Sequence, residues 1–313
     1  MVIKTKHLFI INPVAGGFKG KLEENERYVE SIASSLQEDS EVYITKEPMD
    51  ACRKIAEDAE SVDDLRVYAC GGDGTLNECA NGAAQRGNVA ITHYPRGTGN
   101  DFIRTFGQEN VTKFHDLPAL TKGYIRPLDL IDCGGRYGLN ICSVGIDARV
   151  AADVHKYSSI PIIGGATGYV VALVVNVLRG VGQKFRISTE NGIFDKEITL
   201  TCACNGRFYG GGFNPVPDAL PNDGLLDYLI INAVSRFGIA SIVGKYAKGK
   251  YREIGDRILH IRGRFMEIEC DREFVVNIDG EVIYTEKICF NVVPDGVNFI
   301  FPPELNYFGN ETQ

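Results

Sequence analysis

Tryptophan is absent from the 313-residue sequence, and basic residues are in deficit: 33 Lys and Arg face 41 Asp and Glu, a formal net charge of −8. Without a basic surplus the chain is not expected to bind nucleic acid broadly. The sequence also lacks the His-x-x-x-His and Cys-x-x-Cys pairs that commonly hold zinc. Its nine cysteines are scattered, several within apolar runs, which indicates reduced side chains packed as small hydrophobes.

Long apolar runs are scarce as well. The N-terminal run is too short for a signal peptide, and no small-residue cleavage site follows it. Residues 157–178 contain no charged side chain, but Pro161 and several glycines interrupt them, so we expect a loop and then a buried helix over 166–178 rather than a membrane span. This segment could equally line a lipid pocket or form plain core.

The first third of the chain alternates apolar strand-like segments with amphipathic helical ones. The patterns predict strands over 7–11, 41–45, 65–70 and 89–95, and helices over 21–37, 48–59 and 75–85. Continuous apolar strands between helices indicate a parallel sheet covered on both faces, so we predict a Rossmann-like α/β domain over residues 1–130.

From residue 131 the sequence becomes β-rich. Asn-Gly and Asp-Gly pairs separate its short apolar segments, at 191–192, 223–224, 279–280 and 295–296. We expect an all-β antiparallel sandwich or open barrel over 131–296, with residues 297–313 returning to the first domain.

Three polar, glycine-bearing loops directly follow predicted parallel strands: 12–17 (NPVAGG), 71–75 (GGDGT) and 95–101 (PRGTGND). Open α/β sheets bind ligands beyond the carboxyl ends of their strands. The second loop also precedes a helix, whose unpaired amides favour an anion. Neither G-x-x-x-x-G-K-[ST] nor G-x-G-x-x-G occurs, which argues against a Walker-type ATPase and a standard dinucleotide binder.

Asp73, at the centre of the second loop, places a carboxylate where a phosphate is expected. At about 4 Å the two charges repel by about 4 kcal/mol at an effective dielectric of about 20. The favourable interaction of a phosphate with the helix N-terminus contributes only about 0.3–1 kcal/mol. Mg²⁺ would resolve the conflict because it commonly joins carboxylates to phosphates. The alternative is a turn residue that caps the helix, and the spacing leaves both interpretations open.

In this order, NPVAGG, YACGGDGTLNECANG (68–82) and PRGTGNDF (95–102) resemble the diacylglycerol kinase catalytic-domain family, and more narrowly its soluble bacterial lipid kinases. The resemblance continues through GLNICSVGIDA (138–148), FNPVPDALPNDGLLDY (213–228) and VNIDGEV (276–282), and so covers nearly the whole chain. It implies a nucleotide-binding α/β domain like that of NAD kinases, a C-terminal β-sandwich domain and a cleft between them. It also implies ATP- and Mg²⁺-dependent phosphorylation of a lipid hydroxyl, with diacylglycerol as the first expectation.

The resemblance assigns an ATP site motif by motif: Asn12, Pro13, Val14, Ala15, Gly16, Thr45, Gly71, Gly72, Asp73, Gly74, Thr75, Leu76, Asn77 and Thr98. In the family the Asp of the DGE segment is the general base on the lipid hydroxyl, so Asp279 joins Asp73 as a catalytic candidate, with Glu281 beside it. From the residues alone, Asp279-Gly280 also reads as a two-residue hairpin turn, and the two interpretations are compatible. Alanine at 279 is expected to preserve the fold and ATP binding but to remove phosphoryl transfer.

The resemblance further implies a structural Mg²⁺ site in the second domain. Its ligands would be the carboxylate of Asp223 and the carbonyls of Leu220 and Leu225, and a plain turn is the alternative. Relatives often carry a basic residue at the position of Leu220. This departure puts only that side chain's own contacts in doubt, because a carbonyl ligand does not depend on the side chain.

A lipid kinase must reach a bilayer, so the resemblance implies a cytoplasmic enzyme held peripherally at the inner face of the membrane. Because the net charge is −8, local basic patches must attach it; residues 245–252 and the pair Arg262 and Arg264 are candidates, and a solvated helix face is the alternative. Exposed sandwich edges would permit a homodimer. An NAD kinase, using Asp73 as its base, and a catalytically silent nucleotide- or lipid-binding module are the competing functions. The identity of the lipid is left open.

Overall fold

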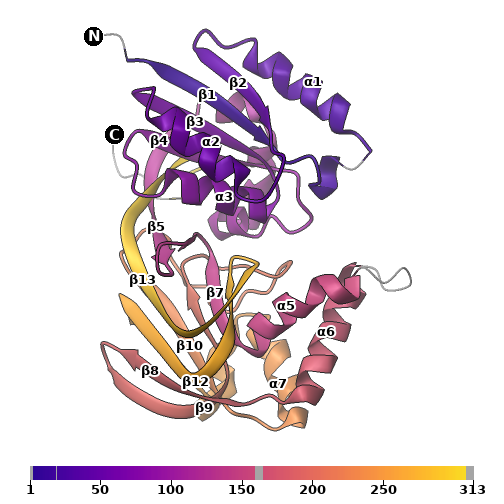
Figure 1. Cartoon of the computed structure of the whole chain (residues 1–313), viewed down its shortest axis with the longest axis vertical. Helices are drawn as coiled ribbons and strands as arrows, with labels where there is room; N and C mark the ends of the chain where they lie inside the picture. The colour runs from indigo at the N-terminus through magenta and orange to yellow at the C-terminus, as the bar shows by residue number, and fades with distance from the viewer. Residues whose placement is uncertain (1–2, 19, 159–164, 308–313) are drawn as a thin grey trace. The chain divides into compact units, whose positions relative to one another are not determined.

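The computed structural model describes residues 3–18, 20–158 and 165–307, and the chain divides into two compact units (Figure 1). Unit 1 comprises residues 1–130 and 294–313, and unit 2 comprises residues 131–293. The sequence-based division places the first boundary at residue 130 and the return at 297. In the structure the return to unit 1 begins at Pro294.

Unit 1 is built on a parallel sheet in the order β4-β3-β1-β2. Its strands are β1 (Thr5–Ile11), β2 (Asp39–Ile44), β3 (Asp64–Gly71) and β4 (Val89–Pro95). The end of β13 (Glu281–Phe301) runs parallel to β4. β2 and β3 lie on opposite sides of β1, so the loops after β1 and β3 meet at a topological switch point, where ligands bind in such sheets.

The helices of unit 1 are α1 (Leu22–Ala33), α2 (Asp50–Ala59), α3 (Asp73–Ala83) and the short α4 (Leu117–Leu120). Ala51, Ile55 and Ala59 of α2 are buried at a spacing of four residues, which sets the face that packs inward. Single-turn or short 3₁₀ segments complete the unit: η1 (Gly16–Phe18), η2 (Phe102–Phe106) and η3 (Gln108–His115).

An aromatic cluster joins the returning segment to the 3₁₀ helices. Phe299 and Phe301 of β13 contact Phe106 of η2, with ring centroids 6.0 and 4.9 Å away. Phe114 of η3 lies 6.4 Å from Phe299. All four rings are buried, so the last strand is part of the core of unit 1.

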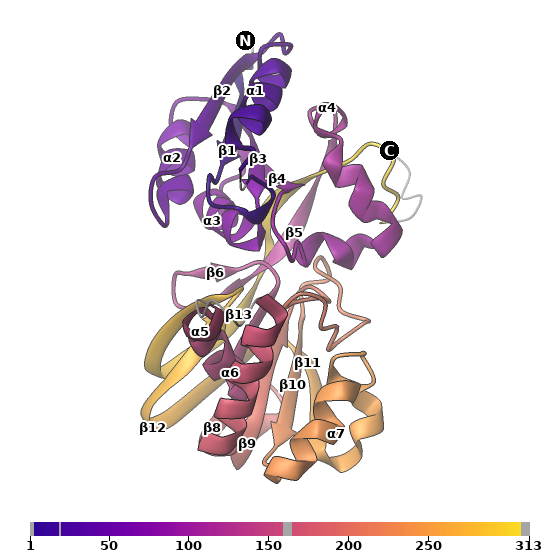
Figure 2. The same ribbon diagram turned by 90° about the vertical axis from the view of Figure 1, so that its right-hand side faces the viewer.

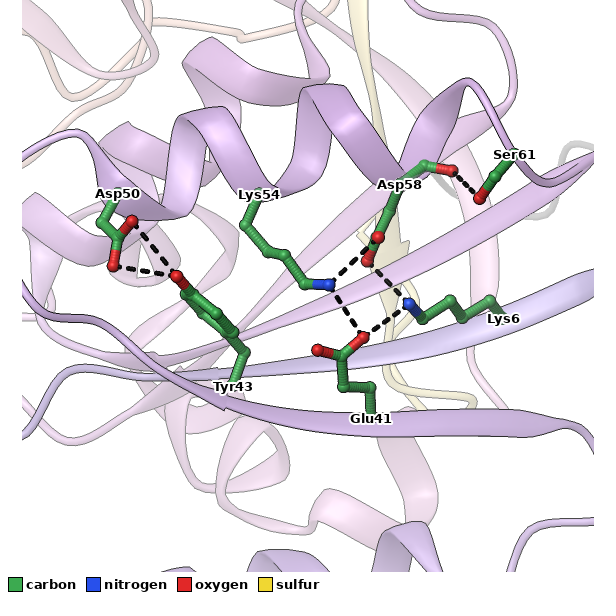
Figure 3. Close-up of polar contacts among 7 residues, drawn as sticks. All are labelled: Lys6, Glu41, Tyr43, Asp50, Lys54, Asp58 and Ser61. Atoms are coloured by element: carbon green, nitrogen blue, oxygen red, sulfur yellow. Dashed lines mark hydrogen bonds and ion pairs between the residues drawn. The ribbon is translucent and has the colours of Figure 1, made fainter.

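Four side chains of alternating charge join α2 to strands β1 and β2 (Figure 3). Lys6 contacts Glu41 at 2.6 Å and Asp58 at 2.9 Å, and Lys54 contacts the same carboxylates at 2.9 and 3.1 Å. Burial disfavours both ammonium groups, but the hydrogen bonds to Glu41 and Asp58 outweigh it and raise the pKa of Lys6 and Lys54. We call these four residues the charge quartet.

Unit 2 is a curled, mainly antiparallel sheet. Its strands are β5 (Tyr124–Asp132, entering from unit 1), β6 (Tyr137–Gly138), β7 (Ile141–Gly145), β8 (Gln183–Thr189), β9 (Gly192–Cys204), β10 (Leu226–Asn232), β11 (Ile258–Gly263), β12 (Phe265–Ile278) and the first part of β13. β9 and β12 each pair with both β7 and β8, so the sheet closes on itself. Tyr228 and Ile230 face one core while Leu229 and Ile231 face another, the two-residue period of a strand buried on both sides.

Helices α5 (Ile146–Ser158), α6 (Gly165–Arg179) and α7 (Arg236–Tyr246) lie beside this sheet (Figure 2), and η4 (Tyr251–Arg257) follows α7. Ile239, Ile242 and Tyr246 of α7 are buried in the same core as Leu229 and Ile231. α6 confirms the predicted helix, whereas residues 159–164 of the predicted loop lie outside the described part. The sequence patterns did not predict α5 and α7, which lie within the domain expected to be all-β. Within the described residues no helix is both long and apolar enough to span a membrane.

One predicted turn is wrong. β13 continues through Asp295-Gly296 as a single strand, with Asp295 at φ 51°. A lone left-handed residue within a strand bends it without reversing the chain, so the Asp-Gly pair here marks a local irregularity.

Candidate active site

The three glycine loops contact one another at the carboxyl edge of the sheet in unit 1. The Asn12 side-chain amide donates to the Thr75 hydroxyl at 3.0 Å. The Gly17 amide donates to the Arg96 carbonyl at 2.6 Å, and the Arg96 amide donates to the Gly71 carbonyl at 2.7 Å. Residues 12–17, 71–75 and 95–101 therefore form one backbone-lined surface, which we call the glycine cradle.

The cradle is too tight for side chains at two points. A Cβ atom on Gly97 would lie 2.5 Å from the Cα of Gly72, and one on Gly17 would lie 2.7 Å from the Arg96 carbonyl oxygen. Neither neighbour is a flexible side chain, so the backbones could approach this closely only through glycine. Gly74 differs, because no atom lies within 4 Å of its Cβ position.

Helix α3 begins inside the cradle without a side-chain cap. Gly72 is its N-cap, in an extended conformation, and Asp73 is its first residue. Amides in the first turn of a helix have no acceptor within the helix, so Asp73, Gly74 and Thr75 present donors that an anion would satisfy.

The other predicted ATP-site residues differ in what they expose to a ligand. The side chains of Thr75, Leu76 and Asn77 are buried, so what they offer a ligand is their backbone. Val14 is 85% exposed, and Thr98 is also exposed, with its methyl group 3.1 Å from the Cβ position of Gly16. Pro13 and Ala15 belong to the first loop. Thr45 follows β2, and its amide donates to the Ile11 carbonyl at 2.9 Å.

Asp73 links two loops of the cradle. Its Oδ1 accepts the Asp101 amide at 2.7 Å, and it makes no capping bond at the start of α3. The Cβ position of Gly99 lies 2.8 Å from Asp73 Oδ2 and 3.5 Å from Asp101 Oδ2, so the two carboxylates flank one glycine. Asp101 is buried and pairs with Arg104 at 3.0 Å.

These carboxylates fit Mg²⁺, which takes one or two protein carboxylates and completes its shell with water and phosphate oxygens. No cluster of three or more His, Cys, Asp or Glu side chains suited to a metal occurs within residues 3–18, 20–158 and 165–307. A cation at Asp73 and Asp101 would therefore depend on the nucleotide for other ligands. Sequence reasoning missed Asp101, although it stands in the quoted PRGTGND loop.

His93 lies beneath the second loop. This residue of β4 is fully buried, and its Nε2 lies 3.0 Å from the Gly71 carbonyl oxygen. Burial lowers the pKa of His93 even though the charge of Asp73 acts to raise it. A neutral ring that donates from Nε2 fixes the Gly71 carbonyl, which makes His93 a positioning residue that no sequence motif revealed.

In unit 2, Asp279 occupies the tip of the β12–β13 hairpin. Asp279 and Gly280 have φ angles of 50° and 97°, as a two-residue turn with both central residues left-handed requires, so the predicted hairpin is confirmed. The carboxylate accepts three consecutive backbone amides: Leu139 at 2.5 Å, Asn140 at 3.1 Å and Ile141 at 2.8 Å. Two motifs distant in sequence, GLNI and VNIDGEV, thus meet at one half-buried carboxylate.

These contacts bear on the prediction for alanine at position 279. Removing the carboxylate would leave three amides of mostly buried residues without this acceptor, and each such loss costs about 1–3 kcal/mol. Alanine would then affect the fold as well as the chemistry. Glu281, beside the turn, lies 3.6 Å from Arg136.

Known protein families match both parts of the chain. Residues 6–133 match the diacylglycerol kinase catalytic domain, and residues 140–301 match the YegS C-terminal NAD kinase beta sandwich-like domain. The chain belongs to the YegS-like lipid kinase family. The predicted resemblance and the predicted class, an α/β domain followed by a β-sandwich-like domain, are both confirmed.

Individual relatives agree with this membership. The chain is 30% identical over 278 residues to a "Probable lipid kinase YegS-like" of Shewanella frigidimarina, covering 87% of this chain and 88% of that protein. A crystal structure of a "putative diacylglycerol kinase" from Bacillus anthracis is 25% identical, with a TM-score of 0.75 over 97% of each chain. Another structure, of a diacylglycerol kinase from the same organism, is 24% identical with a TM-score of 0.69 over 97% of this chain and 99% of that one, and it supports the fold alone.

In unit 2 of this lipid kinase the carboxylate of the predicted Mg²⁺ site has protein partners. Asp223 Oδ1 accepts the Leu225 amide at 3.1 Å, and Asp223 Oδ2 pairs with the Arg262 guanidinium. A cation would have to displace Arg262 from that carboxylate. Leu220, just before this turn, is 39% exposed. The turn is therefore complete without a metal, and the metal site stays a prediction.

The basic run at 245–252 is largely engaged within unit 2. Lys245 donates to the Glu253 carbonyl at 2.8 Å, Lys250 lies 3.3 Å from the Glu253 carboxylate, and Arg252 lies 3.1 Å from Asp218. Lys248 is exposed. Two of these four charges are thus offset by carboxylates, which weakens the run as a membrane patch by itself.

Proposed function

We propose that this lipid kinase uses ATP and Mg²⁺ to phosphorylate the free hydroxyl of diacylglycerol, giving phosphatidic acid. The observation that carries the proposal is the glycine cradle, in which three loops close on one another around the uncapped start of α3. Such a surface offers amides and excludes side chains, which suits a triphosphate.

In unit 1 the amides of Asp73, Gly74 and Thr75 would bind phosphate oxygens, while Asn12 holds Thr75 in place. Asp73 and Asp101 would hold Mg²⁺, which when bound neutralises charge on the transferring phosphoryl group. Transfer of this kind depends chiefly on positioning and charge neutralisation.

In unit 2 we assign Asp279 as the general base for the lipid hydroxyl. The three amide bonds fix the carboxylate's direction, which positions a base well. Besides positioning and charge neutralisation, phosphoryl transfer needs such a group near the attacking oxygen to accept the proton of the hydroxyl.

The proposal includes a cytoplasmic enzyme that attaches peripherally to the inner face of the membrane, with the lipid as its partner and without a nucleic-acid partner. A homodimer through sandwich edges is compatible with it.

The test is transfer of label from γ-labelled ATP to a panel of acceptors with and without EDTA. The panel contains diacylglycerol, phosphatidylglycerol, a sphingoid base, a polyprenol and NAD. We expect labelled phosphatidic acid, formed only when Mg²⁺ is present. Label in NAD would establish an NAD kinase instead, label in another lipid would correct the substrate, and no label in any acceptor would favour a silent binding module.

A further inference from the structure

An open apolar groove runs between two helices of unit 2. It has a volume of about 280 Å³. From α6 it is lined by Val174, Val177 and Leu178, and from α7 by Arg236, Ile239 and Val243. None of these residues belongs to the glycine cradle or to the Asp279 hairpin, so the mechanism does not account for the groove.

Two apolar side chains of the groove are exposed, and so is Phe237, the residue after the groove residue Arg236. Phe237, at the start of α7, is 94% exposed, Leu178 is 63% exposed and Val174 is 53% exposed. Exposed apolar patches with a polar rim commonly mark sites of protein or membrane contact. Ile242 and Tyr246 of α7 are buried against the sheet, and Ile239 lies between that core and the groove.

The charge of the two helices differs from that of the chain. The net charge of the chain is −8, yet the sequences of α6 and α7 contain no Asp or Glu and carry Arg179, Arg236 and Lys245. Arg179 is offset by Asp153 at 2.5 Å. Lys245 donates to the Glu253 carbonyl, and Arg236 makes no ion pair with any residue that the structure describes.

We infer that the α6–α7 face docks on an anionic phospholipid bilayer. Phe237 and Leu178 enter the interface between head groups and acyl chains, while Arg236 meets lipid phosphates. A second copy of the chain is less well matched, because a twofold contact centred on the groove would bring the Arg236 side chains of the two copies together. The inference rests on the proposed function, because a lipid substrate is the reason for this protein to bind a bilayer. Its test does not, because vesicle binding is measured without phosphoryl transfer.

Vesicle co-sedimentation tests it, with phosphatidylcholine vesicles made with and without phosphatidylglycerol. The wild type is expected to bind the anionic vesicles preferentially. Phe237→Ser should weaken this binding about tenfold, because it removes a large apolar side chain from the interface. Arg236→Gln should weaken it about fivefold on anionic vesicles alone and make it less sensitive to salt.

Matched variants on other strands control for nonspecific effects. Ile193→Ser changes a residue of β9 that is 57% exposed, and Lys184→Gln removes an exposed charge from β8. Both should bind vesicles like the wild type. Equal binding to neutral vesicles, or equal losses in the control variants, would overturn the inference. It would also fail if Phe237→Ser abolished a dimer, measured by light scattering, without changing vesicle binding.

An assay with a short-chain diacylglycerol in solution separates the inference from the proposed function. Phe237→Ser should turn over this dispersed substrate like the wild type, because Phe237 lies outside the glycine cradle and the Asp279 hairpin. If the wild type phosphorylated no lipid but still bound vesicles through Phe237, the proposed function would fail and the docking face would stand.

Discussion

The edge of unit 1 and the hairpin tip of unit 2 use backbone amides in opposite ways. In the glycine cradle the loops pack backbone against backbone, and Asp73 accepts one amide there, at 2.7 Å from Asp101. At the hairpin tip the Asp279 carboxylate accepts three amides from residues 139–141. The cradle leaves donors of α3 for an anion, whereas the hairpin uses donors to hold a carboxylate of its own. At the cradle the protein supplies hydrogen-bond donors and the ligand would supply the acceptor. At the hairpin the protein supplies both the donors and the acceptor.

The largest effect is expected at the hairpin. Asp279→Asn keeps the shape of the side chain and tolerates the left-handed backbone, but it removes the proposed base and replaces one of the two oxygens that accept the amides of residues 139–141, so lipid phosphorylation should fall about 10²-fold or more. Initial rates measure this, with ATP affinity followed by calorimetry. Asp295→Asn is the matched control, because Asp295 is also left-handed and should keep its activity. Wild-type turnover in Asp279→Asn would remove the assignment.

The cradle should respond in both stability and ATP binding. Gly97→Ala places a Cβ 2.5 Å from the Gly72 Cα and should cost about 1–3 kcal/mol of unfolding free energy, with weaker ATP binding. Gly74→Ala has open space and should leave stability unchanged or raise it by about 0.5–1 kcal/mol. Chemical denaturation distinguishes them. If the two variants were equally stable, the loops would not be as tightly packed as described.

A third prediction concerns the stability contributed by the charge quartet, which lies outside both regions. Lys6→Met leaves the two quartet carboxylates with Lys54 alone and should cost about 1–2 kcal/mol, since the side chains of Lys6 and Asp58 are each only 12% exposed. Arg27→Met breaks an ion pair whose partners are 77% and 86% exposed and should cost almost nothing. Lipid phosphorylation per folded molecule should not change in either variant.

The smallest effect concerns His93 and pH. Its pKa is lowered in the folded state, so the unfolded chain binds the proton first as pH falls. The contribution of the neutral ring to stability is therefore complete above about pH 6.5 and declines below it, by at most about 1.4 kcal/mol per pH unit for this one proton. His93→Gln keeps a donor for the Gly71 carbonyl and should make this acid-side decline shallower in urea melts taken at several pH values. A decline just as steep would assign it to other groups; His7, whose pKa burial also lowers, is the first candidate.

The sequence predicts unit 1 better than unit 2, and the reason is physical. β1, β3 and β4 are largely buried, apolar strands that alternate with helices, so local pattern and tertiary environment agree there. α7 is short and was missed, although Ile239, Ile242 and Tyr246 have helical spacing. The turn predicted at Asp295-Gly296 is wrong because an Asp-Gly pair can form either a hairpin turn or a bend within a continuous strand.

At the candidate site, the sequence indicates residue types and loop positions but not contacts. The three loops could be identified from glycines that follow strands. Their closure, and the link from Asp73 to Asp101, depend on loop backbones that meet only in the folded sheet. The amides around Asp279 come from positions 138 to 140 residues earlier in the chain, a separation that no local pattern reports.

The most direct test is the initial rate of γ-phosphoryl transfer from Mg²⁺-ATP to diacylglycerol in mixed micelles, measured side by side for the wild type, Asp279→Asn and Asp295→Asn. The account predicts labelled phosphatidic acid from the wild type and Asp295→Asn, and a rate about 10²-fold lower from Asp279→Asn. Label that appeared in NAD, or an Asp279→Asn rate equal to that of the wild type, would contradict it.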